Sequence, residues 1–231
     1  MSVIKAVVFD MDGVMFDTEQ LAVRAWMQVG AESGWPLSRS LCLRLLGLNT
    51  RSAGEVLTQA LGPDFNYPQA RKQMNLRLNQ LIEADGIPIK PGLGQLQQWL
   101  KAAGWPYCVA TSSDQARTDF CLARGGLAQA FTQRICGNQI HRGKPAPDIY
   151  LAASRLLKTR PENCLAIEDS PNGAAAALAA GLQLAVVPDL IPLEAFPAQM
   201  LARARAFADL TELKQALAQG AGSQDQGSGE R

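Results

Sequence analysis

The chain has little of several residue types and patterns that mark common functions. Its 231 residues include a single histidine, His141, which argues against a His-rich metal centre and against Ser-His-Asp catalysis. The formal net charge is +1, so no excess of charge predicts binding to nucleic acid or to an anionic membrane. No apolar run reaches the roughly 18 residues of a membrane-spanning helix. We therefore expect neither a nucleic-acid partner nor a membrane partner.

Cysteines are also few and scattered. There are five, an odd number, and none belongs to a C-x-x-C pair. This pattern predicts neither a zinc site nor a disulfide framework. The N-terminal apolar segment is interrupted by Asp10 and Asp12, unlike that of a signal peptide. We expect buried thiols in a reducing compartment and a cytoplasmic protein.

The stretch from Ile4 to Thr18, IKAVVFDMDGVMFDT, is the most distinctive part of the chain. It begins with apolar, β-prone residues, which are typical of a strand buried on both faces. Asp10 and Asp12 follow at once, and burying either carboxylate is costly unless a cation or hydrogen-bond donors meet it. Because open α/β sheets bind ligands at the carboxyl ends of their strands, we expect a cation-dependent site here.

The pattern of apolar residues changes twice along the remaining chain. Residues 18–86 carry apolar residues at helical spacing between Gly- and Pro-containing turns, which predicts about four short helices without a strand. From Trp105 onward, β-prone runs alternate with helical segments, which predicts a parallel α/β sheet. The strands expected in this second part span residues 106–111, 134–136, 163–167 and 184–187, with a last one beginning at Ala206.

These patterns predict a discontinuous organisation. We expect an α/β core from residues 1–16 and 89–218, and an inserted helical cap domain from residues 17–88. Residues 219–231 have almost no apolar side chains and are expected to be disordered. Because the insertion follows the first strand, it lies above the expected ligand site and would suit a lid.

Four polar clusters lie at or just beyond the expected strand ends: Asp10 with Asp12, residues 111–113, Lys144 in GKPAPD, and residues 168–169. In a parallel sheet these ends meet at one edge, so the clusters can converge. Four neighbouring acids favour a hard divalent cation such as Mg²⁺. A lysine and a hydroxyl beside the cation favour a phosphoryl group as the bound anion.

Two other interpretations of short motifs fail on their own spacing. An EF-hand calcium loop beginning at Asp10 would need an oxygen ligand at Val14 and a glycine at Met15. Gly92 and Gly94 could begin a dinucleotide fingerprint, but no strand precedes them, so we interpret them as a turn and a helix start.

Together, the four clusters give the chain a clear resemblance. It resembles the haloacid dehalogenase superfamily, in the group of beta-phosphoglucomutase-like phosphatases. FDMDGVMFDT is similar to that family's first motif, VATSS to its second, GKPAPD to its third and AIEDSPNG to its fourth. The match covers nearly everything but the tail. The resemblance implies a Rossmann-like parallel-sheet core with an inserted all-helical cap.

The resemblance also implies roles for the matching acids. Asp10 would be the nucleophile that forms an aspartyl-phosphate, and Asp12 would act first as general acid and then as general base. Mg²⁺ would be held by the Asp10 side chain, the Asp12 backbone carbonyl and Asp169, with Glu168 supporting a metal-bound water. The implied cofactor is therefore Mg²⁺.

The substrate would be held by residues of both parts. Thr111 and Lys144 match the positions that hold the transferring phosphoryl oxygens, so they are also expected to be catalytic. The expected substrate-binding residues are Thr111, Ser112, Ser113, Lys144, Arg51 and Asn172. Turn or helix-cap chemistry is the other interpretation of Ser113 and Asn172. Arg51 is the leading candidate from the helical insertion, and Lys72 is the second.

One position departs from the related sugar-phosphate mutases. They have a histidine four residues after the threonine of the first motif, and here that position is Ala22. A mutase must suppress hydrolysis of its aspartyl-phosphate, so we expect a phosphatase acting on a small phosphomonoester, in particular a sugar phosphate. The alternatives are a beta-phosphoglucomutase-like mutase and a non-catalytic phosphosugar-binding module. We expect a monomer.

Overall fold

The computed structural model describes residues 3–48 and 50–225. Within them, six strands form one parallel sheet in the order β3-β2-β1-β4-β5-β6. The strands are β1 (Ala6–Phe9), β2 (Tyr107–Thr111), β3 (Arg134–Cys136), β4 (Cys164–Glu168), β5 (Gln183–Val186) and β6 (Ala204–Ala206). The predicted parallel α/β sheet is confirmed.

β1 lies in the middle of the sheet, as expected for a strand that is apolar on both faces. Val8 pairs with Cys108 of β2 on one side and with Ala166 of β4 on the other. Because successive residues of a strand point to opposite faces, Phe9 enters one hydrophobic cluster and Val8 enters the other. This central position places the residue after Phe9 at the middle of the sheet's carboxyl edge.

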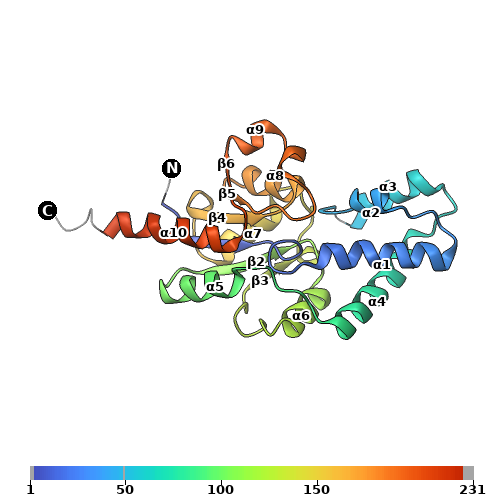
Figure 1. Ribbon diagram of the computed structural model, residues 1–231. Coiled ribbons are helices and arrows are strands. Elements are labelled where there is room, and N and C mark those ends of the chain that lie inside the picture. Colours follow the sequence, from blue (N-terminus) through green and yellow to red (C-terminus); the bar gives the residue numbers. More distant parts are fainter. Residues whose placement is uncertain (1–2, 49, 226–231) are drawn as a thin grey trace.

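Helices cover both faces of the sheet (Figure 1). α5, α6 and α10 pack on the face that contains Phe9, and α7, α8 and α9 pack on the face that contains Val8. These helices are α5 (Leu93–Ala102), α6 (Gln115–Arg124), α7 (Asp148–Leu156), α8 (Pro171–Ala179), α9 (Ala198–Leu201) and α10 (Leu210–Asp225). Among the described residues, no helix is long and apolar enough to span a membrane.

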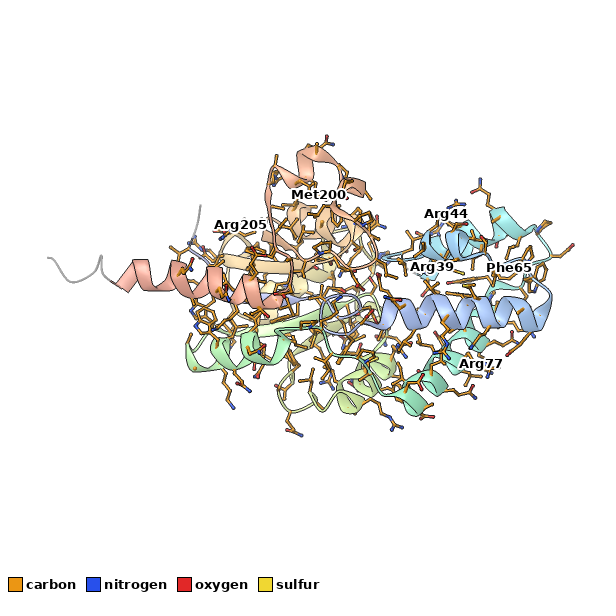
Figure 2. All side chains as sticks on the ribbon, viewed as in Figure 1. Arg39, Arg44, Phe65, Arg77, Met200 and Arg205 are labelled. Carbon is orange, nitrogen blue, oxygen red and sulfur yellow. The ribbon has the colours of Figure 1, made fainter. Side chains whose placement is uncertain are left out.

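In the described part of residues 10–92, a group of four helices is inserted between β1 and α5 and projects from the carboxyl edge of the sheet, at the right of Figure 1. They are α1 (Thr18–Ser33), α2 (Arg39–Leu43), α3 (Thr50–Leu61) and α4 (Tyr67–Asp85). α1 packs along α4, where the Trp26 and Tyr67 rings stack with centroids 6.3 Å apart. Phe65, labelled in Figure 2, lies at the end of the group away from the sheet. The predicted helical insertion is confirmed, whereas its status as a separate domain stays a prediction.

Two predicted boundaries are wrong. β6 ends at Ala206, where we expected it to begin. α10 continues to Asp225, so residues 219–225 are helical where the sequence predicts a disordered tail. Extending an existing helix requires fixing only one residue per new hydrogen bond, so α10 continues past Leu217, its last buried apolar residue. Residues 226–231, the rest of the predicted tail, lie outside the described residues.

Candidate active site

Asp10 stands directly after β1 and is buried beside a lysine and a second acid. Lys144 Nζ donates hydrogen bonds to Asp10 Oδ1 and, at 2.6 Å, to Glu168 Oε1. Asp10, Lys144 and Glu168 are 7%, 3% and 0% exposed, respectively. The ends of two neighbouring strands and the loop before α7 therefore meet at this point. A cation buried between two carboxylates offsets part of their desolvation cost.

Glu168, the last residue of β4, is held by several donors. Its Oε1 also accepts from the Tyr150 hydroxyl at 2.5 Å, and its Oε2 accepts from the Ser170 hydroxyl at 3.2 Å. Ser170 is at the same time the N-cap of α8, where its hydroxyl accepts from the backbone N–H of Gly173. A Cβ at Gly173 would lie 1.9 Å from Glu168 Oε1, so only glycine lets α8 begin this close to the carboxylate.

Asp12 has a different set of neighbours. The Thr18 hydroxyl donates to Asp12 Oδ1, and the Ser113 hydroxyl donates to Oδ2 at 3.0 Å. The backbone N–H of Ser113 in turn donates to the Thr111 hydroxyl at 3.0 Å, which fixes the turn after β2. Asp12 is thus oriented by neutral hydroxyl groups, whereas Asp10 is paired with a cation.

A buried acidic cluster consists of Asp10, Glu168 and Asp169, whose nearest oxygens all lie within 4.8 Å of one another. Asp169 is 2% exposed, and its Oδ2 has no hydrogen-bond partner among the described residues. A Cβ at Gly13, which has a φ of +85°, would lie 2.1 Å from that oxygen. Oxygen-only donors, an unpartnered buried oxygen and a close-packed glycine fit a small hard cation.

The surroundings shift the pKa values of these groups. Burial raises the pKa of Asp10 to about 7, and Glu168 and Asp12 add to this effect while Lys144 opposes it. Burial, followed by repulsion from Glu19 and Glu168, raises the pKa of Asp169 well above its usual range. Burial opposes the charge of Lys144, yet the two carboxylates it contacts outweigh burial and raise its pKa. Without a cation, Asp10 and Asp169 are therefore harder to ionise than ordinary carboxyl groups.

Glu19 is a further buried acid that the sequence analysis missed. It lies in the first turn of α1, is 5% exposed, and its Oε2 has no partner among the described residues. Burial, followed by repulsion from Asp189, raises its pKa to about 9. Acids are common and usually exposed in the first turn of a helix, so the sequence alone does not set Glu19 apart. Its place after the Asp-Thr pair of the first motif is the one signal that could have found it.

A cavity of about 460 Å³ lies between the carboxyl edge of the sheet and the inserted helices. This volume falls in the range typical of small-molecule sites. Asp10, Asp12 and Lys144 line it from the core, and α1 and α4 contribute Trp26 and Met74 from the insertion. The cavity therefore combines a charged end with a partly apolar wall.

Most of the predicted site residues converge on this cavity. Those lining it are Asp10, Asp12, Thr111, Ser112, Ser113, Lys144, Asp169 and Arg51. Glu168 does not line it but contacts Lys144 from behind. Arg51 reaches the cavity from α3, although its side chain is 90% exposed and pairs with Glu55 at 3.0 Å.

Two predicted substrate-binding candidates lie elsewhere. Asn172 is in the first turn of α8 and is absent from the cavity lining, and Ser170 rather than Asn172 caps that helix. Lys72 is exposed on α4 and does not line the cavity, whereas its neighbour Arg71 does. The sequence predicts the segment correctly here, but not which residue of the helix faces inward.

Comparisons with known proteins show the family and the fold of this chain. A family model described as haloacid dehalogenase-like hydrolase matches residues 4–181. The "Probable pseudouridine-5'-phosphatase" of Drosophila melanogaster is 34% identical over 79% of this chain and 80% of that protein. The beta-phosphoglucomutase of Bacillus subtilis is 32% identical over 77% of this chain and 80% of that protein. CbbY from Rhodobacter sphaeroides, crystallised with phosphate, has a TM-score of 0.79 at 28% identity, covering 91% of this chain and 96% of that chain.

Proposed function

The chain belongs to the haloacid dehalogenase-like hydrolases, and on this premise we propose that it is an Mg²⁺-dependent phosphatase of small phosphomonoesters, in particular sugar phosphates. The reaction would pass through an aspartyl-phosphate on Asp10. The resemblance expected from the four motifs is confirmed, because the family model spans most of the chain. One relative is named as a phosphatase and another as a mutase, so the remaining choice is between these two activities.

The observation that carries this proposal is the different environment of two acids one residue apart. Asp10 is buried and paired with Lys144, so its carboxylate is positioned and partly neutralised for attack on an anionic phosphoryl group. Asp12 is held by the hydroxyls of Thr18 and Ser113. A hydroxyl both donates and accepts, so these partners suit either protonation state of Asp12. The pair therefore suits one nucleophile and one acid/base.

Each residue then has a defined task in the reaction. An Asp10 oxygen attacks phosphorus in line, the P–O bond to the substrate alcohol breaks, and Asp12 gives that oxygen its proton. Asp12 next takes a proton from the water that attacks the aspartyl-phosphate, which releases phosphate and restores Asp10. Thr111 and Lys144 hold the phosphoryl oxygens throughout.

The acidic cluster would hold the metal ion. Asp10, Asp169 and the Asp12 backbone carbonyl are the proposed ligands, with Glu168 behind them. When bound there, Mg²⁺ supplies positive charge that compensates the phosphoryl oxygens. The donor set supports this choice, because it contains oxygen atoms only.

A phosphomutase is the second candidate, and the 32% identity to the Bacillus subtilis beta-phosphoglucomutase favours it. Ala22 opposes it. Ala22 lines the cavity from α1. The mutases that this chain resembles carry a histidine at the same position. A methyl group there has no proton to donate and no lone pair to accept one. We therefore expect water to be the acceptor of the phosphoryl group.

The test is hydrolysis of 4-nitrophenyl phosphate with Mg²⁺, followed by Asp10→Asn. Loss of the nucleophile should lower kcat by at least about 1,000-fold. Glu162→Gln, which alters an exposed acid paired with Arg160, should match the wild type. Turnover retained by a folded Asp10→Asn protein would refute the nucleophile assignment. Conversion of β-glucose 1-phosphate to glucose 6-phosphate without release of phosphate would establish the mutase instead.

Other expectations stay predictions. A non-catalytic phosphosugar-binding module would bind glucose 6-phosphate in the calorimeter yet release no phosphate from any ester. The monomeric state and the cytoplasmic location rest on composition and on resemblance.

A further inference from the structure

We propose that the substrate carries a second anionic group, recognised by a second-anion subsite consisting of Arg71, Asn75 and Arg117. This inference deepens the proposed function and rests on it. The three side chains line the same cavity as the acidic cluster, but they come from α4 and α6 rather than from the strand ends. None of them belongs to the predicted site.

The α4 wall of the cavity has a regular layout. Arg71, Asn75 and Asn79 follow one another at four-residue intervals, so they form a polar line along one face of the helix. Met74 and Leu78 form a neighbouring apolar line, and both of these buried side chains line the cavity. Such a wall offers a sugar carbon skeleton an apolar surface beside a row of hydrogen-bonding groups.

Arg117 is brought to this wall by a contact between the core and the insertion. Its Nη1 donates to Asn79 Oδ1 of α4 at 2.7 Å. Its backbone N–H donates to Asp114 Oδ1 at 2.8 Å, which fixes the first turn of α6. A guanidinium has five N–H donors, and the bond to Asn79 uses one of them. The side chain is thus oriented while retaining capacity for a ligand.

Arg71 and Arg117 differ from the other cationic side chains of the cavity in their ion pairing. Lys144 is paired with Asp10 and Glu168, and Arg51 is paired with Glu55. In the described part of the chain, neither Arg71 nor Arg117 forms an ion pair with an acidic side chain. Arg71 instead donates to the Tyr67 hydroxyl at 3.3 Å.

Both guanidinium-bearing side chains are half-buried. Removing a cation from water without an acidic partner is costly, and an anionic ligand would offset that cost. The planar fork of arginine matches phosphate and carboxylate oxygens, so either group fits. The shared chemistry is a sugar phosphate bearing a second phosphate or a carboxylate.

The experiment compares kcat/KM for matched esters. Glucose 6-phosphate has one anionic group, 6-phosphogluconate adds a carboxylate, and glucose 1,6-bisphosphate adds a phosphate. We expect the wild type to favour one or both of the doubly anionic esters. Arg71→Met and Arg117→Met should each lower kcat/KM for the favoured ester by roughly 10- to 100-fold, mainly through KM. The loss for glucose 6-phosphate, which lacks the second anionic group, should be at least about threefold smaller than the loss for the favoured ester.

Three further variants separate charge from structure. Arg77→Met, in the same helix, removes an arginine that pairs with Glu32 and lies outside the cavity, so it should match the wild type. Arg77 is labelled in Figure 2. Arg117→Lys should restore part of the preference because it restores the charge. Asn79→Ala keeps both guanidinium groups but removes the contact that orients Arg117, so it should lower the preference less than Arg117→Met does. An Arg117→Lys protein with no more preference than Arg117→Met would refute charge recognition by Arg117.

Failure of the subsite and failure of the proposed function give different results. If 4-nitrophenyl phosphate is hydrolysed but all three sugar esters react alike in the wild type and in both arginine variants, the subsite is refuted and the phosphatase stands. If no ester is hydrolysed, the phosphatase is refuted. Calorimetric titration with glucose 1,6-bisphosphate then decides the subsite, because equal affinity in wild type and variants would overturn it.

Discussion

Replacing Gly173 with alanine should damage both stability and activity, against the usual effect of this substitution in a helix. Alanine is normally favoured over glycine in a helix by up to about 1 kcal/mol. At Gly173, however, the new Cβ would lie 1.9 Å from Glu168 Oε1 and 2.1 Å from Oε2. Real Cβ contacts stay beyond 3.0 Å, so the carboxylate or the helix must move by roughly 1 Å.

The Glu168 carboxylate has no room for such a shift. It is 0% exposed and accepts from Lys144 at 2.6 Å and from Tyr150 at 2.5 Å. A hydrogen bond to a charged group contributes about 1.5–3 kcal/mol. Losing one or two of these bonds, less the gain in helix propensity, gives a net loss of about 3 kcal/mol. For a chain of this size, that corresponds to roughly 6–12 °C in Tm.

Gly94 provides the matched control, because it also lies in the first turn of a helix, α5. A Cβ there would meet nothing within 4 Å. Gly94→Ala should therefore be neutral or stabilising by up to about 1 kcal/mol. Thermal unfolding of both variants, with phosphatase assays alongside, checks the contrast. A Gly173→Ala protein as stable and as active as Gly94→Ala would show that Glu168 need not stay where it is.

Three further predictions concern the buried acids. Since the pKa of Glu19 is about 9 when folded and 4.5 ordinarily, the folded state keeps a proton that the unfolded state loses, and metal-free stability should fall as pH rises between these values. In urea unfolding, Glu19→Gln should gain nothing at pH 4 but at least about 2 kcal/mol at pH 8; equal stability at pH 8 would contradict this. Mg²⁺ at 100 times its Kd should stabilise the folded protein by about 3 kcal/mol, and EDTA should reverse this effect. Binding should also release protons, because Asp10 and Asp169 must ionise to bind the metal, and calorimetry in two buffers measures this release. Asp10→Asn should weaken both the stabilisation and the proton release. Tyr150→Phe removes one of the donors to Glu168 and should cost about 1.5–3 kcal/mol in denaturant unfolding. A cost under about 0.5 kcal/mol would refute the importance of this hydrogen bond.

The sequence predicts the sheet well because its signals are local. Apolar, β-prone runs such as residues 163–167 coincide closely with observed strands, and the acids at their ends mark the carboxyl edge. Ser170 and Asn172 show the limit. Both are suited to capping or binding, but where α8 begins decides that Ser170 takes the cap and that Asn172 stays outside the cavity.

Glu19, Arg71 and Arg117 were missed for a different reason. Each lies on a helix whose sequence would equally suit a solvated charge, and only the packing of the insertion against the core turns it inward. The Asn79 contact that orients Arg117 joins residues 38 positions apart. No periodicity or short motif carries that information.

The central position of β1 has a consequence for how the chain matures. Ala6 pairs with Cys164, so the first strand leaves the ribosome 158 residues before one of its two neighbours is made. At bacterial or eukaryotic elongation rates, the delay is on the order of 10 to 30 s. The inserted helices are complete well before β4 and can pack among themselves during that interval. Asp10, the proposed nucleophile, is among the first residues synthesised and thus acquires its pocket among the last steps of folding. Any chain that stops short of Glu168 leaves an apolar strand exposed to aggregation.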